Sequence, residues 1–322
     1  GQQHKPPEPI TGTDTPLLSV RNLTTRFPVK GGFFRRTLAH VHAVEDLSFT
    51  LNKGQTLSLV GESGCGKSTA GRSILRLVEP TSGQVDLDGT DVMGLAPGGL
   101  RDARRDMQMI FQDPFASLNP QMALGEQVAE PMRNFGTHSG AALRERVGML
   151  FDRVELPRSY LRRYPHELSG GQRQRVAIAR ALALSPKLIV ADEAVSALDV
   201  SVQAQVLNLG RWLATEMGLS CLFFSHDMAV VERVSLKVAV RYLGRIVDIG
   251  PRAAVFGDPR HAYTRALMKA VPVADPLRRK SEKDLKFKPI ASPIHAVGHV
   301  PAKTVFEEVS PDHFVLTSDS GY

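Results

Sequence analysis

The sequence has few cysteines and no long apolar run, and each of these shortages excludes certain classes of protein. Its two cysteines, Cys65 and Cys221, lie far apart in 322 residues and form no Cys-x-x-Cys pair. They indicate neither a disulfide framework nor a zinc or iron–sulfur site of that type, and the low count fits a reducing compartment. No apolar run approaches the roughly 20 residues of a membrane-spanning helix, and there is no apolar signal segment. We therefore expect a cytoplasmic protein.

Aromatic residues are also scarce, at 6% of the chain, and this bears on how its charge is interpreted. Forty basic against thirty-three acidic residues give a net charge of +7. The densest basic stretches are Arg101–Arg105, Arg162–Arg163 and Arg278–Lys288, and aromatic residues do not alternate with them as in a single-strand binding groove. The charge alone is compatible with nucleic acid, anionic lipid or nucleotide as a partner, and equally with a solvated, mildly basic surface.

What the sequence does contain is an alternation of strand and helix patterns, which predicts a parallel sheet covered on both faces. The expected strands are Leu17–Arg26, Val41–Leu51, Thr56–Val60, Met107–Phe111, Lys187–Asp192, Leu219–Ser225 and Leu236–Leu243. The expected helices are Lys67–Val78, Gly140–Val154, Gln172–Leu184, Ser201–Met217, Asp227–Val234 and one from Pro259 to near Val271.

Three stretches depart from this alternation. Residues 1–16 are polar and rich in proline, which predicts a linker or disordered arm. The loop-rich and helical stretch of about residues 113–168 is expected to form an inserted helical subdomain. Beyond Val271 the chain becomes a basic, proline-containing tail.

Residues Gly61–Ser68 match the phosphate-binding loop pattern Gly-x-x-x-x-Gly-Lys-Ser in full, and Thr69 follows. The pattern stands between a predicted strand and a predicted helix, which is the context it requires. Glycines let backbone N–H groups turn toward phosphate oxygens, and the helix N-terminus adds a positive dipole. Lys67 is expected to reach the terminal phosphates and Ser68 to bind Mg²⁺. The candidate phosphate-loop residues are Gly61, Ser63, Gly64, Cys65, Gly66, Lys67, Ser68 and Thr69.

An apolar strand, Leu188–Ala191, ends in two carboxylates. Asp192 can hold Mg²⁺ through water, and Glu193 stands one residue further, where a carboxylate can polarise an attacking water. By itself this pattern is also typical of a buried strand that leaves the sheet onto a polar loop. Together with the phosphate loop it predicts nucleotide hydrolysis.

Residues Leu168–Gln172 place a serine and two glycines at the start of a helix, which makes a second anion-binding terminus. An ordinary N-cap beside a glycine gives the same pattern. One terminal phosphate needs only one such cradle. Two cradles in one chain indicate either that each binds a different nucleotide or that two chains share each nucleotide.

Leu168–Gln172 matches the signature of ABC ATPases, and with the phosphate loop it identifies the chain as similar to that family over about Leu17–Pro272. Ser196–Asp199 resembles the family's D-loop, Gln112 its Q-loop glutamine and His226 its switch histidine. The resemblance implies ATP and Mg²⁺ as ligands. It assigns hydrolysis to Glu193, His226 and Gln112, metal binding to Ser68, Gln112 and Asp192, and nucleotide contacts to Ser169, Gly170, Gly171, Gln172 and Asp199. Phe27 lies near where the family stacks an aromatic ring on adenine, although a core or turn phenylalanine is the alternative.

Two further segments resemble the peptide/nickel importer group, namely Gln112–Pro120 and His261–Leu267. That group usually has proline where this chain has Ala262. Many of its members also carry a cysteine cluster after this point, which is absent here, so no iron–sulfur site is expected. Val41–Glu45 and Ala191–Val200 are most similar to the second half of fused glutathione-import ATPases.

The resemblance implies an α/β fold of the P-loop NTPase (RecA-like) class with an antiparallel β subdomain. It places an ATPase domain at residues 17–257 and a C-terminal extension of the oligopeptide-transporter type at residues 258–322. It also implies a head-to-tail pair of ATPase units, separate transmembrane permease subunits and, indirectly, a periplasmic or extracellular solute-binding protein. The expected location is then the inner face of the plasma membrane.

Three alternatives remain open at this point. A soluble ABC ATPase acting on nucleic acid or ribosomes would explain the positive charge, but it predicts a long charged coiled coil between the motif clusters. An exporter ATPase domain usually lacks the extension near His261–Leu267. A catalytically dead half is disfavoured by the intact Lys67, Asp192, Glu193 and His226.

Overall fold

The computed structural model describes residues 16–31, 36–61, 67–113, 117–270, 293–301 and 304–317. The chain divides into two compact units. The first unit consists mainly of Gly94–Phe223 with the short stretch Leu51–Gln55, and the second of Leu17–Thr50, Thr56–Met93 and Phe224–Tyr322. Each is described in turn.

The first unit contains a parallel strand pair and a group of helices. Strands β8 (Ser220–Ser225), β7 (Leu188–Asp192) and β6 (Met107–Ile110) lie side by side in that order, with β6 and β7 parallel. The helices are α2 (Pro97–Asp106), α4 (Leu124–Asn134), α5 (Gly140–Arg153), η1 (Arg158–Arg162), η2 (Pro165–Glu167), α6 (Gly170–Leu182) and α7 (Val200–Met217).

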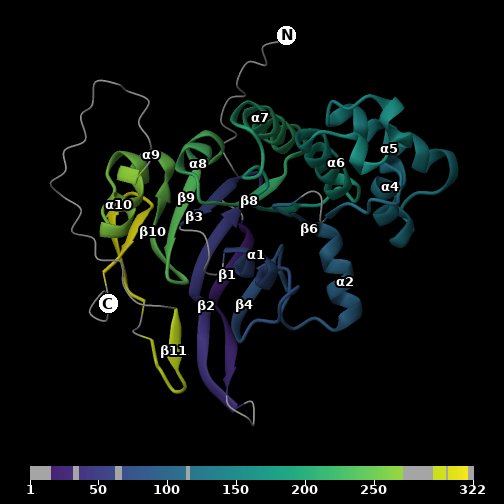
Figure 1. Ribbon diagram of the computed structural model, residues 1–322. Coiled ribbons are helices and arrows are strands. Elements are labelled where there is room, and N and C mark those ends of the chain that lie inside the picture. Colours follow the sequence, from purple (N-terminus) through teal and green to yellow (C-terminus); the bar gives the residue numbers. More distant parts are fainter. Residues whose placement is uncertain are drawn as a thin grey trace, which may run out of the picture. The chain divides into compact units, whose positions relative to one another are not determined.

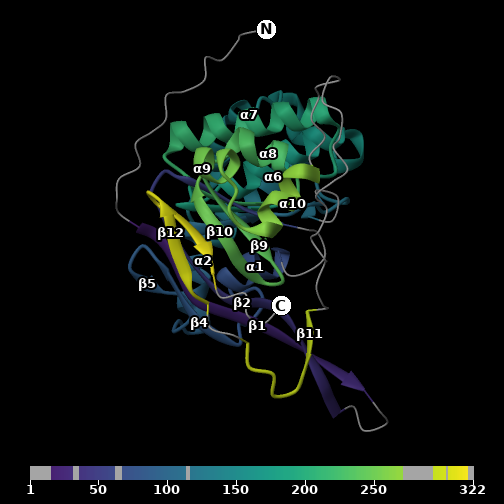
Figure 2. The same ribbon diagram turned by 90° about the vertical axis from the view of Figure 1, so that its left-hand side faces the viewer.

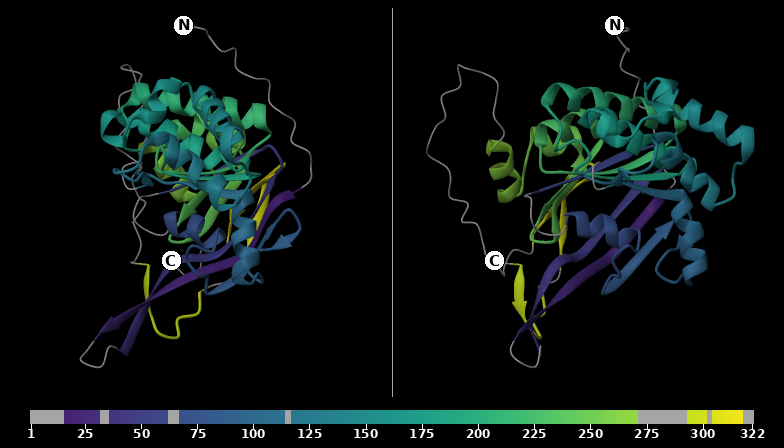
Figure 3. Two further views of the ribbon diagram at one scale, coloured as in Figure 1. Left: turned by 90° about the vertical axis from the view of Figure 1, so that its right-hand side faces the viewer. Right: turned by 45° about the vertical axis from the view of Figure 1, so that its right-hand side comes forward.

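Helices α4, α5 and α6 contact one another, as the teal helices of Figures 1 and 3 show. On α4 the buried apolar side chains recur at Leu124, Val128 and Met132, and on α5 at Leu143, Val147 and Leu150. This spacing of three or four residues gives each helix one apolar stripe, which is buried against its neighbours. The helical character predicted for about residues 113–168 is confirmed by α4, α5, η1 and η2.

The second unit contains two sheets. One has the strand order β11-β2-β1-β4-β5, and the other includes β12-β13-β10-β9-β3. The first sheet comprises β1 (Pro16–Gly31), β2 (Arg36–Asn52), β4 (Ser82–Leu87), β5 (Thr90–Asp91) and β11 (Ile294–Ala296). The second includes β3 (Thr56–Val60), β9 (Lys237–Tyr242), β10 (Arg245–Pro251), β12 (Phe306–Ser310) and β13 (His313–Leu316). In Figure 2, β9 and β10 are green and β12 is yellow.

Strand β3 runs parallel to β9, whereas β10, β13 and β12 add antiparallel strands beyond it. Helices α1 (Lys67–Ile74), α8 (Met228–Val234), α9 (Arg252–Gly257) and α10 (Ala262–Ala270) complete the unit. Its core is aliphatic, with Val60, Val231, Val240 and Val255 fully buried, and Tyr263 of α10 belongs to it. Helix α10 is therefore packed into the core of this unit.

The α/β fold with a parallel core and an antiparallel sheet is confirmed, but several boundaries differ. Helix α1 ends at Ile74, four residues before the predicted end at Val78. Arg76 has a positive φ of 48°, and the carbonyl of Arg72 accepts the N–H groups of both Leu77 and Val78. This turn closes the helix early. The domain boundaries predicted from sequence remain predictions.

Among the described residues no helix is both long and apolar enough to cross a membrane.

Candidate functional site

The phosphate loop has the strand-to-helix context that its pattern requires. Strand β3 is almost entirely buried and leads to Gly61, and helix α1 begins at Lys67. A Cβ atom on Gly61 would lie 2.2 Å from the carbonyl oxygen of Arg241 on β9, so the backbones approach too closely for any other residue. Four predicted phosphate-loop residues, Ser63, Gly64, Cys65 and Gly66, lie outside the described residues, and the side chain of Lys67 is not described.

Helix α1 is tied to strand β1. The hydroxyls of Ser73 on α1 and Thr25 on β1 are 2.8 Å apart in a buried hydrogen bond. Ser68 and Thr69, in the first turn of α1, are half-buried. Phe27 follows Thr25 by two residues, and 39% of its surface is exposed. Phe27 is therefore not a core residue, and its exposed ring is available to stack on a ligand.

His226 directly follows β8 and is held between two local hydrogen-bonded turns. The N–H of Asp227 donates to Ser225 Oγ (3.0 Å), and the Asp227 carboxylate accepts the N–H of Ala229 (2.8 Å) as the N-cap of α8. His226 is exposed. The backbone of His226 is fixed between the end of β8 and the start of α8, so the position of its Cα atom, from which the side chain projects, is fixed as well.

In the first unit, Asp192, Glu193 and Gln112 leave the sheet at one edge. Strands β6 and β7 are parallel and in register, with Ile110 opposite Ala191. Gln112 therefore follows β6 at the level where Glu193 follows β7. Asp192 is buried, Glu193 is half-buried and Gln112 is exposed. The edge so formed carries two carboxylates and one amide.

Glu193 has a positive φ of 48°, an uncommon conformation for a residue other than glycine. Its carbonyl accepts both the N–H and the hydroxyl of Ser196, each at 3.0 Å. The chain thus turns sharply at the end of β7. Strained backbone of this kind persists only where the surrounding structure holds it in place, and it is concentrated at functional sites.

The signature residues begin helix α6 with a reciprocal capping box. The N–H of Gln172 donates to Ser169 Oγ (3.3 Å), and the N–H of Ser169 donates to Gln172 Oε1 (3.0 Å). Ser169 is exposed and Gly171 is buried. The N-cap that the sequence left open as an alternative is therefore present at Ser169. The reciprocal capping role of Gln172 was not predicted, although Ser-x-x-Gln before a helix is its usual signal.

The D-loop residues Ser196–Asp199 lead directly into α7. Asp199 is the N-cap of α7, yet its side chain makes no capping hydrogen bond, and it is exposed. Leu198 lies against Gly170 of the signature, and Val202 of α7 lies against Gly171. The signature and the D-loop are therefore packed together within the first unit.

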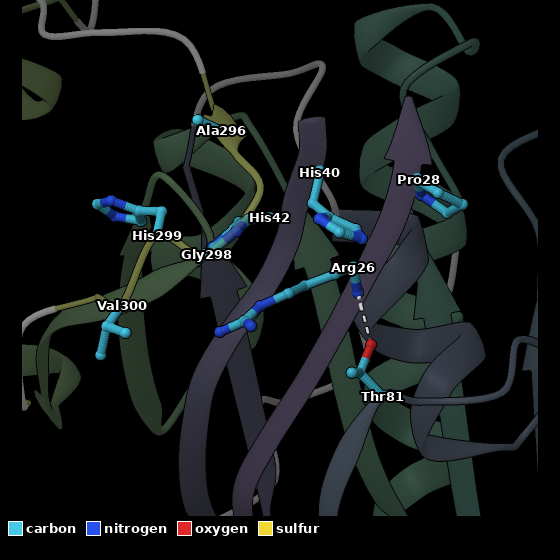
Figure 4. Close-up of a pocket in the computed structure, with 9 residues that line it drawn as sticks. All are labelled: Arg26, Pro28, His40, His42, Thr81, Ala296, Gly298, His299 and Val300. Atoms are coloured by element: carbon cyan, nitrogen blue, oxygen red, sulfur yellow. Dashed lines mark hydrogen bonds between the residues drawn. The ribbon is translucent and has the colours of Figure 1, made fainter. Parts of the chain in front are cut away.

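The second unit has a pocket that the sequence analysis missed, of about 410 Å³. Figure 4 shows its lining residues, which are Arg26, Pro28, His40, His42, Thr81, Ala296, Gly298, His299 and Val300. Arg26 forms two hydrogen bonds to the Glu45 carboxylate (3.0 and 2.7 Å), and His42 Nδ1 lies 3.0 Å from the same group. These residues come from segments about 250 residues apart, so sequence spacing gives no signal of the pocket.

Three imidazole rings meet beside this pocket. The rings of His295 and His299 stack with centroids 4.2 Å apart, and that of His42 lies 4.6 Å from His295. Burial lowers the pKa of His42, opposed by the Glu45 charge, and burial together with the neighbouring His299 lowers the pKa of His295. No three metal-binding side chains among the described residues are arranged to hold a metal ion.

Comparison with known families matches two regions of the chain. The ABC transporter family matches residues 44–196, and the C-terminal region of oligopeptide/dipeptide transporters matches residues 247–295. The glutathione import ATP-binding protein GsiA of Pectobacterium atrosepticum is 53% identical over 310 residues, covering 96% of this chain and 50% of the relative. GsiA of Escherichia coli K12 is 52% identical over 322 residues, covering 100% and 52%. The chain thus spans about half the length of these curated relatives.

Solved structures show the same fold. A dimeric post-hydrolysis state of the ATP-binding cassette MJ0796, bound to ADP and Pi, superposes with a TM-score of 0.65 at 29% identity, covering 73% of this chain and 98% of that one. CbiO1 of Clostridium perfringens, part of the ABC transporter complex cbiONQ, gives 0.65 at 24% identity, covering 76% and 92%. With the motifs and the fold described above, these matches show that the chain belongs to the ABC transporter family of ATP-binding proteins and that its C-terminal region is of the oligopeptide/dipeptide transporter type.

Proposed function

We propose that this chain binds and hydrolyses ATP to power an ABC importer for peptides or glutathione-like solutes. The observation that carries the proposal is its identity of 52–55% with glutathione import ATP-binding proteins over almost its full length. The similarity includes the C-terminal region, which the oligopeptide/dipeptide transporter family matches independently. The relatives are about twice as long, so the solute and the partners are inferred from them.

Each motif has a physical role in this reaction. The N–H groups of the loop that begins at Gly61, with Lys67, bind the ATP phosphates, and the exposed ring of Phe27 stacks on the base. Ser68, Asp192 and Gln112 offer the hard oxygen donors that Mg²⁺ prefers. Mg²⁺ held by these oxygen donors would neutralise negative charge on the ATP phosphates.

Hydrolysis is assigned to the strained turn at the end of β7. Glu193 accepts a hydrogen bond from the attacking water and polarises it, and the two bonds from Ser196 fix the backbone from which its side chain projects. Gln112 orients the water from the neighbouring strand end, and His226 contacts the terminal phosphate.

The signature implies that two ATPase units share each nucleotide. Ser169 and the glycines of one unit, with Asp199, face the terminal phosphate held by Lys67 of the other. The partner ATPase unit is a sister domain or another copy of this chain. Permease subunits dock on the pair at the inner face of the membrane, and a solute-binding protein delivers the solute to them.

The rival function on nucleic acid predicted a long charged coiled coil near residues 113–168. Within the described residues 117–168, the longest helix is α5 with 14 residues. The family matches likewise favour transport, so no specific nucleic-acid partner is proposed.

The test is a pair of variants measured by nucleotide binding and single-turnover hydrolysis. Glu193→Gln keeps the size of the side chain and loses its charge, so ATP binding should persist while hydrolysis falls about 10²–10⁴-fold. Lys67→Ala should fail earlier, at binding. Glu216→Gln, an exposed change on α7, is the matched control and should alter neither step.

Hydrolysis of bound ATP by Glu193→Gln at the parental rate would show that another group activates the water. The transport part of the proposal has a separate test. The chain is isolated together with its membrane subunits, and uptake of glutathione and of a dipeptide into vesicles is measured with and without ATP. ATP-independent uptake, or uptake of neither solute, would contradict it.

A further inference from the structure

Two glycines of the signature, Gly170 and Gly171, are not required by backbone conformation. Neither belongs to the described glycines with positive φ, so an alanine could adopt the same backbone. Glycine at a helix start instead of alanine also forgoes helix stability. Because backbone conformation does not require glycine, the space that a side chain would occupy at each position is the next feature to examine.

The neighbouring helix occupies that space. A Cβ atom on Gly171 would lie 2.4 Å from Val202 Cγ1, and the next nearest atom, at 3.8 Å, also belongs to Val202. A Cβ atom on Gly170 would lie 3.2 Å from Leu198 Cδ2. Both missing side chains would therefore point toward the D-loop and the start of α7.

The same segment is bonded to the catalytic turn. Ser196 donates two hydrogen bonds to the carbonyl of Glu193. At the other end, the N–H of Gln203 donates to Asp199 O (2.8 Å) and its side-chain amide donates to Leu198 O (2.9 Å). The turn from Glu193 to Asp199 is thus closed at both ends and leads without a break into Val202.

We propose that Val202 is a positioning residue that, with Leu198, fixes the signature helix relative to the catalytic turn of the same unit. This rests on the proposed function. In a pair of ATPase units that share two nucleotides, Glu193 acts on one nucleotide. The signature of the same ATPase unit acts on the other nucleotide. Val202 therefore couples the two nucleotides mechanically, and Gly171 is glycine because Val202 fills its side-chain space.

A double-variant cycle on the full chain tests this. Single-turnover hydrolysis is measured at a protein concentration where the parent's rate per chain is maximal, and binding of a fluorescent ATP analogue is measured in parallel. Gly171→Ala should lower the rate about tenfold or more, because overpacking against Val202 displaces the helix start. Val202→Ala should have a smaller effect. The double variant should return to within about threefold of the Val202→Ala rate.

Two controls separate this role from loss of folding. Val202→Leu enlarges the other partner and should reproduce the Gly171→Ala defect. Gly210→Ala, on the same helix with nothing within 4 Å, should leave the rate unchanged. Binding of the ATP analogue should remain at the parental level in every variant, which a general loss of structure would not allow.

Three outcomes would overturn the inference. If the double variant is as slow as Gly171→Ala, the glycine is needed for approach of the nucleotide. If Gly171→Ala is as fast as the parent, the packing has no role. If Val202→Leu is unaffected, Val202 does not set the helix start. Failure of the proposed function appears differently, as an absence of hydrolysis of bound ATP by the parent chain itself.

Discussion

Gly61 is a residue whose requirement comes from packing rather than from its own backbone angles. A Cβ atom there would lie 2.2 Å from the Arg241 carbonyl oxygen, and backbone atoms cannot rotate away as a side-chain end can. Strand β9 and the start of the phosphate loop are therefore in direct contact. The phosphate-loop pattern in the sequence already demands a glycine at this position, but it gives no hint of this contact.

We expect Gly61→Ala to lower the free energy of unfolding by about 1–3 kcal/mol, because the added methyl overpacks against backbone. Urea unfolding followed by circular dichroism measures this. Gly210→Ala adds the same methyl in open space within a helix, and it should stabilise by about 0.5–1 kcal/mol. Equal effects of the two changes would contradict the close approach of β3 and β9.

At the same scale, the sequence predicts which residues belong to a motif better than it predicts which residues contact them. The motif residues Asp192, Glu193 and Gln112 could be assigned to one sheet edge from strand endings alone, because parallel strands end together. Val202 could not, because nothing in its own sequence neighbourhood shows that Gly171 lies beside it. Contacts between residues far apart in the chain depend on how helices pack, which periodicity does not encode.

Strand β11 is attached beside a cluster of titratable side chains. It pairs with β2 through Ile294–Val41 and Ala296–Ala39, and the N–H of His42 donates to Pro293 O (2.9 Å). The stacked imidazoles of His295 and His299 then lie against His42. Among the described residues, the charged groups that act on His42 and His295 are the Glu45 carboxylate and the Arg26 guanidinium, and the Arg245 guanidinium also acts on His295.

We expect acid to loosen this attachment. Burial lowers the pKa of His42 and of His295 below the ordinary value of 6.5, so the unfolded chain binds protons more readily than the folded one. The stabilisation is fully present above pH 6.5 and is lost as the pH falls below 6.5 toward the folded pKa values. Hydrogen exchange of the β2 and β11 amides at pH 7.5 and 5.5, corrected for intrinsic rates, should show faster opening at the lower pH.

The matched variant is His42→Gln, which keeps a polar side chain and removes the buried titrating group. It should show a smaller change in β11 protection between the two pH values than the parent shows. An identical change in both proteins would place the acid sensitivity elsewhere in the chain.

Some elements were predicted well and others were missed, for identifiable reasons. Buried strands such as β3 and β7 can be predicted because each is a short apolar run in the sequence. Helix α4 was missed because Pro131 lies inside it, and α2 because it begins Pro-Gly-Gly and has no buried residue. The β12–β13 hairpin was missed because its strands are short. It is fastened to β10 by a buried contact between His313 Nε2 and Asp248 Oδ1 (2.7 Å), which only the folded structure reveals.

At the scale of the whole molecule, the two candidate phosphate-binding segments predict behaviour that depends on concentration. If two units share each nucleotide, dilution should separate them and lower the ATPase rate per chain, while ATP binding persists through the phosphate loop. Steady-state hydrolysis over a wide range of protein concentrations, with fluorescent-nucleotide binding alongside, measures both. A rate per chain that stays constant down to dilute monomer would contradict the shared site.

The fold class and the nucleotide motifs were predictable at this scale because the family motifs are specific and occur in a fixed order. The strand pairing was less predictable. In the first sheet of the second unit, β11 lies at one edge beside β2, although the two are separated by most of the chain. Such long-range pairings leave no periodic signal in the sequence.

The pairing of β11 with β2 also sets an order of events during synthesis on the ribosome. Val41 emerges about 250 residues before Ile294, which at the usual 5–20 residues per second is a delay of roughly 12–50 s. Throughout that interval the β2 edge has no partner strand from β11, and unpaired strand edges are sites of aggregation. A translation pause before residue 294 would prolong this exposure, and a truncation there would make it permanent, so the β2 edge depends on a strand that is synthesised much later.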